Sequence, residues 1–197
     1  MKDLIEASGI FIYPLGLCSI IAVFIVIERL LALRPGKVVP IHIQNDIIEK
    51  NSLPPGEADS VAGRILLFHQ QRHPDADQIK AFGKMEVLGM ERGLFLLDVV
   101  ISAAPLLGLL GTVTGLVRVF SKVSPETGVP EPQAFVTGVS LALATTVVGL
   151  AIAIPAIVFN SYMNRRVEML AARLNVLVER IVTIDTKNEA EKAARSI

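Results

Sequence analysis

The sequence predicts an all-α membrane protein with three transmembrane helices, of which the second and third extend into the cytoplasm beside a small helical cytoplasmic domain. Apolar residues make up 52% of the chain and charged residues only 19%. Three windows of 21, 19 and 33 residues contain no charged side chain, namely residues 7–27, 99–117 and 132–164. About 20 apolar residues in a helix cross a bilayer core, and lipid offers the backbone no hydrogen-bond partner. Each window is therefore predicted to span the membrane as a helix.

The first transmembrane helix is expected within residues 1–33, ending before Pro35. Asp3 and Glu6 precede its apolar part, and no small-residue cleavage site follows, so we expect a retained anchor rather than a cleaved signal peptide. Residues 34–93 form the predicted cytoplasmic segment. Pro40 opens a short helix there, and a second helix over residues 58–71 ends at His-Pro-Asp.

From residue 76 onward the pattern is helical without a strong breaker before Pro105, so the second transmembrane helix, residues 94–120, is expected to continue a cytoplasmic helix. Residues 121–133 form a short, turn-rich periplasmic loop. The third transmembrane helix, residues 134–163, should run on into a helical cytoplasmic tail, residues 164–197. Six apolar residues of this tail repeat at spacings of three and four, which predicts a seam for helix–helix association within the chain or between copies: Val167, Leu170, Leu174, Leu177, Ile181 and Ile184.

The placement of Lys and Arg residues predicts the orientation in the membrane. Nine lie in residues 28–93 and seven in the tail, whereas the first nine residues and the loop at 121–133 carry one each. Basic residues favour the cytoplasmic side. We therefore expect a multi-pass inner-membrane protein with a periplasmic N-terminus and a cytoplasmic C-terminus.

The sequence offers no enzyme chemistry. It contains no phosphate-binding loop, no nucleophile–base set and no cluster of cysteine ligands, and Cys18 is the single cysteine. His69 and His73 precede two aspartates, but Pro74 interrupts the helix there, so we interpret this stretch as a solvated loop rather than a metal site. We expect no cofactor and no metal, and a net charge of zero gives no indication of nucleic-acid binding.

The three neutral windows also lack a carboxylate that could carry a proton through the membrane; Asp98 and Arg118 only bracket the second span. Small and hydroxyl residues instead follow helical spacing on two stripes. One interpretation is close helix packing, with the threonine hydroxyls bonding to carbonyl oxygens of their own helix. The other is that the stripes form the wall of a polar passage, or a sleeve around another helix. The two stripes are Pro105, Gly108, Thr112 and Gly115, and Gly138, Ala142, Thr146, Gly149 and Ala153.

Three stretches resemble the ExbB/TolQ branch of the MotA/TolQ/ExbB proton-channel family: "GIFIYPLGLCSIIAVFIVIERLLAL", "MERGLFLLDVVISAAPLLGLLGTVTGL" and "GVSLALATTVVGLAIAIPAIVFN". The resemblance implies a pentamer around two copies of a single-span ExbD/TolR-like partner, which supplies the membrane aspartate. It places the ion pathway at Thr112 and Thr146, with Thr145 and Ser140 as further hydroxyls. Where the family often has a glutamate, this chain has Leu141.

The leading hypothesis is therefore an ion-conducting stator subunit, with the proton as the expected ion. It would couple the ion-motive force to mechanical work and energise outer-membrane transport or envelope maintenance. The alternative is a non-conducting oligomeric scaffold of the inner membrane. A channel built from this chain alone is disfavoured by the absence of buried charge.

Overall fold

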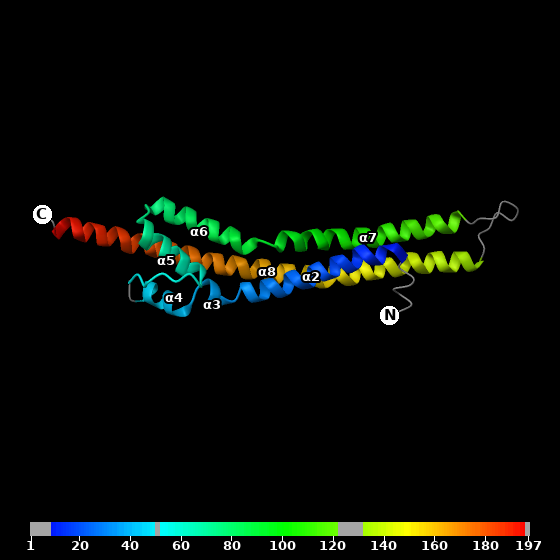
Figure 1. The fold of residues 1–197 in the computed structure, drawn as a ribbon, viewed down its shortest axis with the longest axis horizontal. Coiled ribbons are helices and arrows are strands. Elements are labelled where there is room, and N and C mark those ends of the chain that lie inside the picture. The colour runs from blue at the N-terminus through cyan, green and yellow to red at the C-terminus, as the bar shows by residue number, and fades with distance from the viewer. Residues whose placement is uncertain (1–8, 50–51, 122–131, 196–197) are drawn as a thin grey trace. The chain divides into compact units, whose positions relative to one another are not determined.

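The computed structural model describes residues 9–49, 52–121 and 132–195, and this part of the chain contains helices and no β-strand. Three of its helical stretches, within residues 12–32, 76–120 and 135–188, are long and apolar enough to cross a membrane. The predicted fold class is thus confirmed. In chain order (Figure 1) the elements are the 3₁₀-helix η1 (Gly9–Phe11), α2 (Ile12–Ala32), α3 (Pro35–Val38), α4 (Ile41–Ile48), α5 (Val61–Arg72), α6 (Ala76–Glu91), α7 (Leu94–Phe120) and α8 (Pro132–Arg195).

The chain divides into two compact units. Residues 1–27 and 93–162 form the first, which holds most of the apolar helical sequence and is called the spanning unit below. Residues 28–92 and 163–197 form the second, called the polar unit. The predicted periplasmic loop lies almost entirely outside the described residues.

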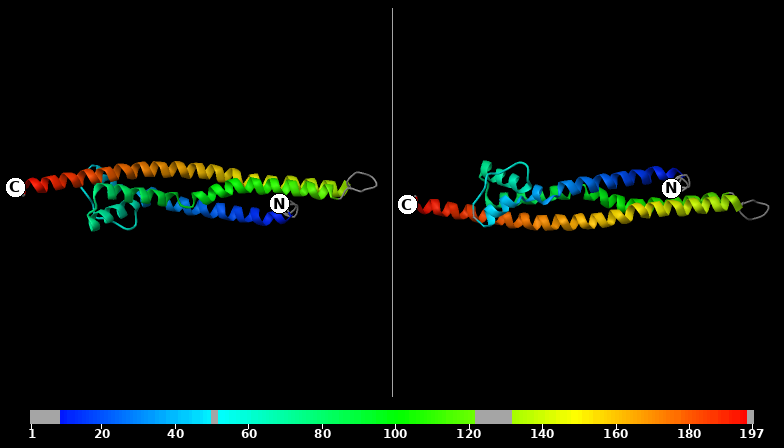
Figure 2. Two further views of the ribbon diagram at one scale, coloured as in Figure 1. Left: turned by 90° about the horizontal axis from the view of Figure 1, so that it is seen from above. Right: turned by 90° about the horizontal axis from the view of Figure 1, so that it is seen from below.

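The spanning unit is a three-helix bundle in which α2 packs against α7 and α8 (Figures 1 and 2). Leu15 of α2 meets Ala104 of α7 and Ala153 of α8 in one buried cluster. Ala22 and Ile25 meet Leu97, Val100 and Ala156 in a second. Most large side chains of this unit point away from these clusters, as suits helices surrounded by lipid, where small residues make the helix contacts.

The expectation of an unbroken helix from residue 76 into the second span is wrong, because α6 ends at Glu91 and α7 begins at Leu94. Gly93 has φ of 84°, a left-handed conformation that a glycine adopts without steric cost. Arg92, with ψ of 138°, is extended. Pro105, by contrast, lies inside α7 without ending it. It lacks an N–H, so the helix forgoes one backbone hydrogen bond there.

The third helix does continue into the tail, since α8 runs for 64 residues. Its buried positions recur at spacings of three and four along both units. In the spanning unit they are mostly small, and in the polar unit they are the large apolar residues of the predicted seam, all six of which are buried. The seam is thus covered within the single chain, and beside it a Cβ at Gly83 of α6 would lie 3.0 Å from Cγ2 of the neighbouring Val178 of α8.

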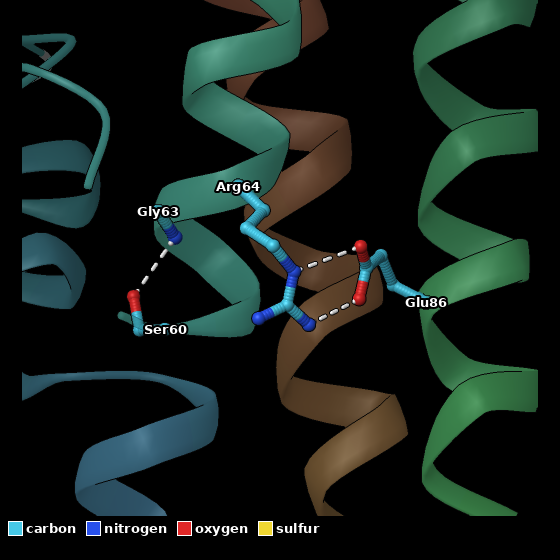
Figure 3. Close-up of polar contacts among 4 residues, drawn as sticks. All are labelled: Ser60, Gly63, Arg64 and Glu86. Atoms are coloured by element: carbon cyan, nitrogen blue, oxygen red, sulfur yellow. Dashed lines mark hydrogen bonds and ion pairs between the residues drawn. The ribbon is translucent and has the colours of Figure 1, made fainter. Parts of the chain in front are cut away.

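In the polar unit, an ion pair joins α5 to α6 (Figure 3). The Arg64 guanidinium donates to both carboxylate oxygens of Glu86, at 3.0 Å from Nε and 2.5 Å from Nη2. This hydrogen bonding raises the pKa of Arg64. Next to it, the Ser60 hydroxyl caps α5 by accepting from the Gly63 N–H at 3.0 Å. Arg64 and Glu86 both line a cleft of about 710 Å³.

The interpretation of residues 69–77 as a solvated loop is wrong for His69, which is buried in α5 with Nε2 3.5 Å from Asp185 Oδ1 of α8. His73 ends α5 with φ of 44°, and the carboxylate of Asp75 caps α6 by accepting from Gln78 N–H at 2.8 Å. Within the described ranges, no three metal-ligating side chains gather at one place. These residues therefore hold helices together.

Candidate functional site

The closest helix contact of the spanning unit is made by glycines of α7 and α8, which run antiparallel. A Cβ at Gly108 would lie 3.0 Å from Thr146 Cα, and one at Gly149 would lie 2.5 Å from the Ala104 carbonyl oxygen. Farther along, a Cβ at Gly115 would lie 2.8 Å from the Gly138 oxygen. We call this the α7–α8 contact; its positions are Ala104, Gly108, Gly111 and Gly115 on α7, and Gly138, Ala142, Thr145 and Gly149 on α8.

Threonine hydroxyls of α8 reach across this contact to the backbone of α7. Thr146 Oγ1 donates to the Gly108 carbonyl oxygen at 3.2 Å. Thr145 Oγ1, which is fully buried, donates to the Ala142 oxygen of its own helix at 2.9 Å and lies 3.4 Å from the same Gly108 oxygen. On α7, Thr112 Oγ1 donates to the Leu109 oxygen at 2.6 Å. The hydroxyl protons are thus directed to carbonyls, while oxygen lone pairs remain available as acceptors.

Thr112 and Thr146 lie on the same side of the α7–α8 contact. Each directly follows a contact position, Gly111 or Thr145, and each residue of a helix is turned about 100° from the one before it. Because the two helices are antiparallel, both turns lead to the same flank. Both side chains are half-buried, as is Pro105, which follows Ala104. We call this side the threonine flank.

The opposite side of the contact is covered by α2. Leu107 and Val148 pack there against the cluster of Leu15, Ala104 and Ala153. The threonine flank instead carries exposed leucines, with Leu109 57% and Leu150 43% exposed. In the chain by itself, the polar side of the contact is therefore the open side.

The structure divides the predicted site residues into three groups. Pro105, Thr112 and Thr146 lie on the threonine flank, whereas Thr145 and the remaining small residues are buried within the chain. Those small residues, predicted to line a passage or meet a partner, here pack helix on helix: Gly108, Gly115, Gly138, Ala142, Gly149 and Ala153. Ser140 is exposed six residues before Thr146, which turns it about 120° away. The side chain of Leu141 lies outside the described part of the chain.

Sequence reasoning missed two residues of this region. Gly111 is a contact position, since a Cβ there would overlap the Thr145 side chain. The spacing of four, three and four through Ala104, Gly108, Gly111 and Gly115 carries this signal as well as the predicted stripe does. Asn160 is the other. Its amide Nδ2 donates to Asp98 Oδ1 at 2.5 Å, joining α8 to α7.

Proteins of one known family are similar to this chain over more than half of its length. The sequence profile of the MotA/TolQ/ExbB proton channel family matches residues 60–176. The "Biopolymer transport protein exbB1" of Vibrio cholerae is 31% identical over 173 residues, covering 80% of this chain and 76% of that protein. The "Putative biopolymer transport protein ExbB-like 1" of Synechocystis is 33% identical, covering 75% of this chain and 64% of that protein.

The "Putative biopolymer transport protein ExbB-like 3" of Synechocystis is 33% identical over 172 residues, covering 78% of this chain and 80% of that protein. The "Biopolymer transport protein ExbB" of Helicobacter pylori is 32% identical over 101 residues, about half of this chain. The family match includes all of α7, with its glycines and Thr112, and α8 through Thr146 and Asn160. The chain therefore belongs to the MotA/TolQ/ExbB proton channel family, in its ExbB/TolQ branch.

Proposed function

We propose that the chain is the proton-conducting stator subunit of a motor in the bacterial inner membrane, which couples the proton-motive force to mechanical work through a single-span partner of the ExbD/TolR type. The observation that carries the proposal is the open threonine flank, where Thr112 and Thr146 converge. Each elementary charge that crosses 100 mV makes about 2.3 kcal/mol available. That energy is sufficient to bias a conformational step of a few kcal/mol.

The threonine hydroxyls are arranged to meet a protonated carboxyl group. Their protons are engaged by the Leu109 and Gly108 carbonyl oxygens, so each Oγ1 presents lone pairs to the flank. A carboxylic acid donates its O–H to such an oxygen. A carboxylate finds no donor there until a hydroxyl rotates away from its carbonyl. The flank thereby distinguishes the two protonation states of a carboxyl group that moves along it.

The carboxyl group itself is assigned to the partner. Asp98 is the single acidic residue among the described residues of the spanning unit, and fourteen residues separate it from Thr112. This is about 21 Å along the helix at 1.5 Å per residue. The chain thus provides hydroxyls beside Gly108 and no acid at that depth, which fits a partner that brings a membrane aspartate.

In the assembly we propose, five copies of the chain surround two copies of the partner, with the threonine flanks toward the centre and the exposed apolar side chains toward neighbouring copies and lipid. The N-terminus faces the periplasm and the C-terminus the cytoplasm. The names of the relatives, biopolymer transport proteins, support energised transport across the outer membrane, or envelope maintenance, as the process powered. Ser140, on the other side of α8, would meet the pathway only from a neighbouring subunit.

A non-conducting scaffold is less well supported. That function rests on small stripes and a tail seam that remain free to join copies. Gly108, Gly115, Gly138 and Gly149 are instead occupied by the neighbouring helix of the same chain, and the six seam residues are buried within it.

Site-directed cross-linking to the partner tests the proposal. Cys18 is first replaced by Ser, and single cysteines are then placed at Leu109 and Leu110, which are neighbours of similar exposure, 57% and 50%. Leu109 lies on the threonine flank, and Leu110 is turned about 100° farther away from it. With a cysteine beside the partner's membrane aspartate, we expect the position-109 variant to cross-link and the position-110 variant not to. Cross-linking at 110 alone, or at neither position in a complex that copurifies, would contradict the proposed sleeve.

A further inference from the structure

Asp98 and Asn160 form an acid–amide pair near one end of the spanning unit. Asn160 Nδ2 donates to Asp98 Oδ1 at 2.5 Å. Asn160 is only 8% exposed, and its Oδ1 is buried with no hydrogen-bond partner. Such an orphaned buried oxygen is unusual in a folded protein and calls for a functional explanation. The pair therefore has an unused acceptor next to an acid.

The unused acceptor makes the pair suitable for both protonation states of Asp98. When Asp98 is ionised, the amide N–H₂ of Asn160 donates to it, as in the structure. When Asp98 is protonated, its O–H is a donor, and a rotated amide presents Oδ1 to accept it. The same two residues thus stay hydrogen-bonded whether or not a proton is held. A purely structural pair has no need of the second arrangement.

Asp98 lies on the same face of α7 as the proposed pathway. Asp98, Pro105 and Thr112 are spaced by seven residues, close to two helical turns each, and Asp98 directly follows the fully buried Leu97. The spacing is matched on the other helix, where fourteen residues separate Thr146 from Asn160. One pair thus stands about 21 Å from the other along two antiparallel helices.

The side chain of Asp98 is exposed among mainly apolar neighbours. It lies at the edge of a mostly apolar hollow lined also by Phe95, Val99, Ser102, Ala103 and Leu106. Along the chain, the nearest charged residue is Arg92, six positions before Asp98, and α7 itself carries its other charge at Arg118, twenty positions after it. A carboxylate in such surroundings is stable when water reaches it, and it is disfavoured when an apolar surface covers it.

We propose that Asp98 binds a proton at the cytoplasmic end of the threonine flank, with Asn160 as its positioning residue. The inference rests on the proposed function. In one passage, the Asp98 carboxylate takes a proton that the partner's aspartic acid has released, forming an O–H bond, and later gives that proton to cytoplasmic water. No electrons are transferred, and Asp98 returns to the carboxylate held by Asn160.

Proton uptake by proteoliposomes that contain the chain with an ExbD/TolR-type partner tests this inference. Flux is driven by a potassium diffusion potential and followed with a pH-sensitive dye. We expect Asp98→Asn, which keeps the shape but holds no exchangeable acid proton, to lower the flux at least about tenfold, since positioned proton-transfer groups commonly contribute ~10²-fold or more. Thr114→Val is the control, because the Thr114 hydroxyl bonds the Leu110 main-chain oxygen of its own helix, at 2.8 Å, and Thr114 does not line the hollow beside Asp98.

Asp98→Glu distinguishes proton binding from a purely structural role, because a structural role would leave the pH profile of the flux unchanged. It retains an acid in an altered position, so we expect flux to persist with a shifted pH profile. This variant also decides the matter should Asp98→Asn fail to assemble. An unshifted profile for Asp98→Glu, wild-type flux in Asp98→Asn, or a flux that requires sodium and ignores pH would overturn the inference.

The stator proposal and this inference fail in distinguishable ways. If the wild-type complex conducts, Thr146→Val does not, and Asp98→Asn conducts as wild type, then only the role of Asp98 is lost. If the wild-type complex carries no proton flux, the proposed function fails and the inference fails with it.

Discussion

The hydroxyl of Thr146 on α8 donates a hydrogen bond to the carbonyl oxygen of Gly108 on α7, at 3.2 Å. The bond exists because Gly108 has no side chain: a Cβ there would lie 3.0 Å from both Thr146 Cα and the Thr145 carbonyl oxygen. Glycine and threonine therefore serve one arrangement. The glycines allow two membrane helices to approach, and the approach places a hydroxyl on an open flank.

Gly111→Ala should destabilise the spanning unit more than any other glycine-to-alanine change on α7. The new Cβ would overlap the Thr145 side chain. That side chain is fully buried, and its hydroxyl donates to the Ala142 carbonyl oxygen. Overpacking of this kind typically costs about 1–3 kcal/mol. The loss should appear as a lower midpoint of thermal unfolding in detergent.

Gly16→Ala is the matched control for that change, because nothing lies within 4 Å of a Cβ built at this position of α2. We expect the control variant to unfold within about 0.5–1 kcal/mol of the wild type, the size of the ordinary difference between Gly and Ala in a helix. Equal effects of the two substitutions would show that the α7–α8 contact is looser than described.

Leu174→Ala tests whether the tail seam belongs to the single chain. Leu174 is 1% exposed among residues of its own polar unit. Removing its side chain should cost about 2–5 kcal/mol of unfolding free energy, without changing the number of subunits in the purified complex. Val176→Ala, at a half-exposed position, should cost much less. A change in subunit number with little loss of stability would assign the seam to contacts between copies.

The Arg64–Glu86 pair makes a specific prediction about stability in the polar unit. The side chain of Arg64 is 43% exposed and that of Glu86 17%, so solvent screens the pair and Arg64→Met should cost no more than about 1 kcal/mol. The loss should shrink as salt is added. The exposed Arg165–Glu168 pair, whose atoms are 3.5 Å apart, is the control: Arg165→Met should leave the midpoint nearly unchanged.

The pH dependence of that contribution follows from the raised pKa of Arg64. A group whose pKa is higher in the folded chain stabilises it fully below its pKa in the unfolded chain, and the effect is lost as pH rises through the folded pKa. Arg64 stays protonated from about pH 5 to about pH 9, so its protonation contributes no pH dependence to the stability in that range. The difference in midpoint between wild type and Arg64→Met should stay constant there, and a difference that vanishes toward pH 9 would contradict it.

Most of the fold could be predicted because it follows from charge placement and periodicity. A run without charge that is long enough to cross a bilayer has few alternatives to a helix. The six seam residues at spacings of three and four are all buried on α8. The break at Gly93 was missed, since a glycine within a helical pattern is compatible with both a continuous helix and a left-handed turn.

The site was only partly predictable. Thr112 and Thr146 lie together on one flank, but periodicity alone did not distinguish the stripe through Pro105 and Thr112 from the one through Ala104 and Gly111. The two stripes differ by one residue, which turns the face by about 100°. The choice depends on α8, which meets the glycines. The pairing of Asp98 with Asn160 joins residues 62 positions apart, and no local pattern contains it.

The most direct test of the account is proton flux through the reconstituted complex with the ExbD/TolR-type partner, compared between Thr146→Val and Thr114→Val. Both changes remove a hydroxyl of similar size, but the Thr114 hydroxyl bonds only the Leu110 carbonyl oxygen of its own helix, at 2.8 Å. Without the Thr146 oxygen, the buried O–H of the partner's acid lacks its acceptor, which costs about 1–3 kcal/mol, so Thr146→Val should lower the flux by roughly 10- to 100-fold with assembly intact, and Thr114→Val should leave it unchanged. Wild-type flux in an assembled Thr146→Val complex would contradict the account.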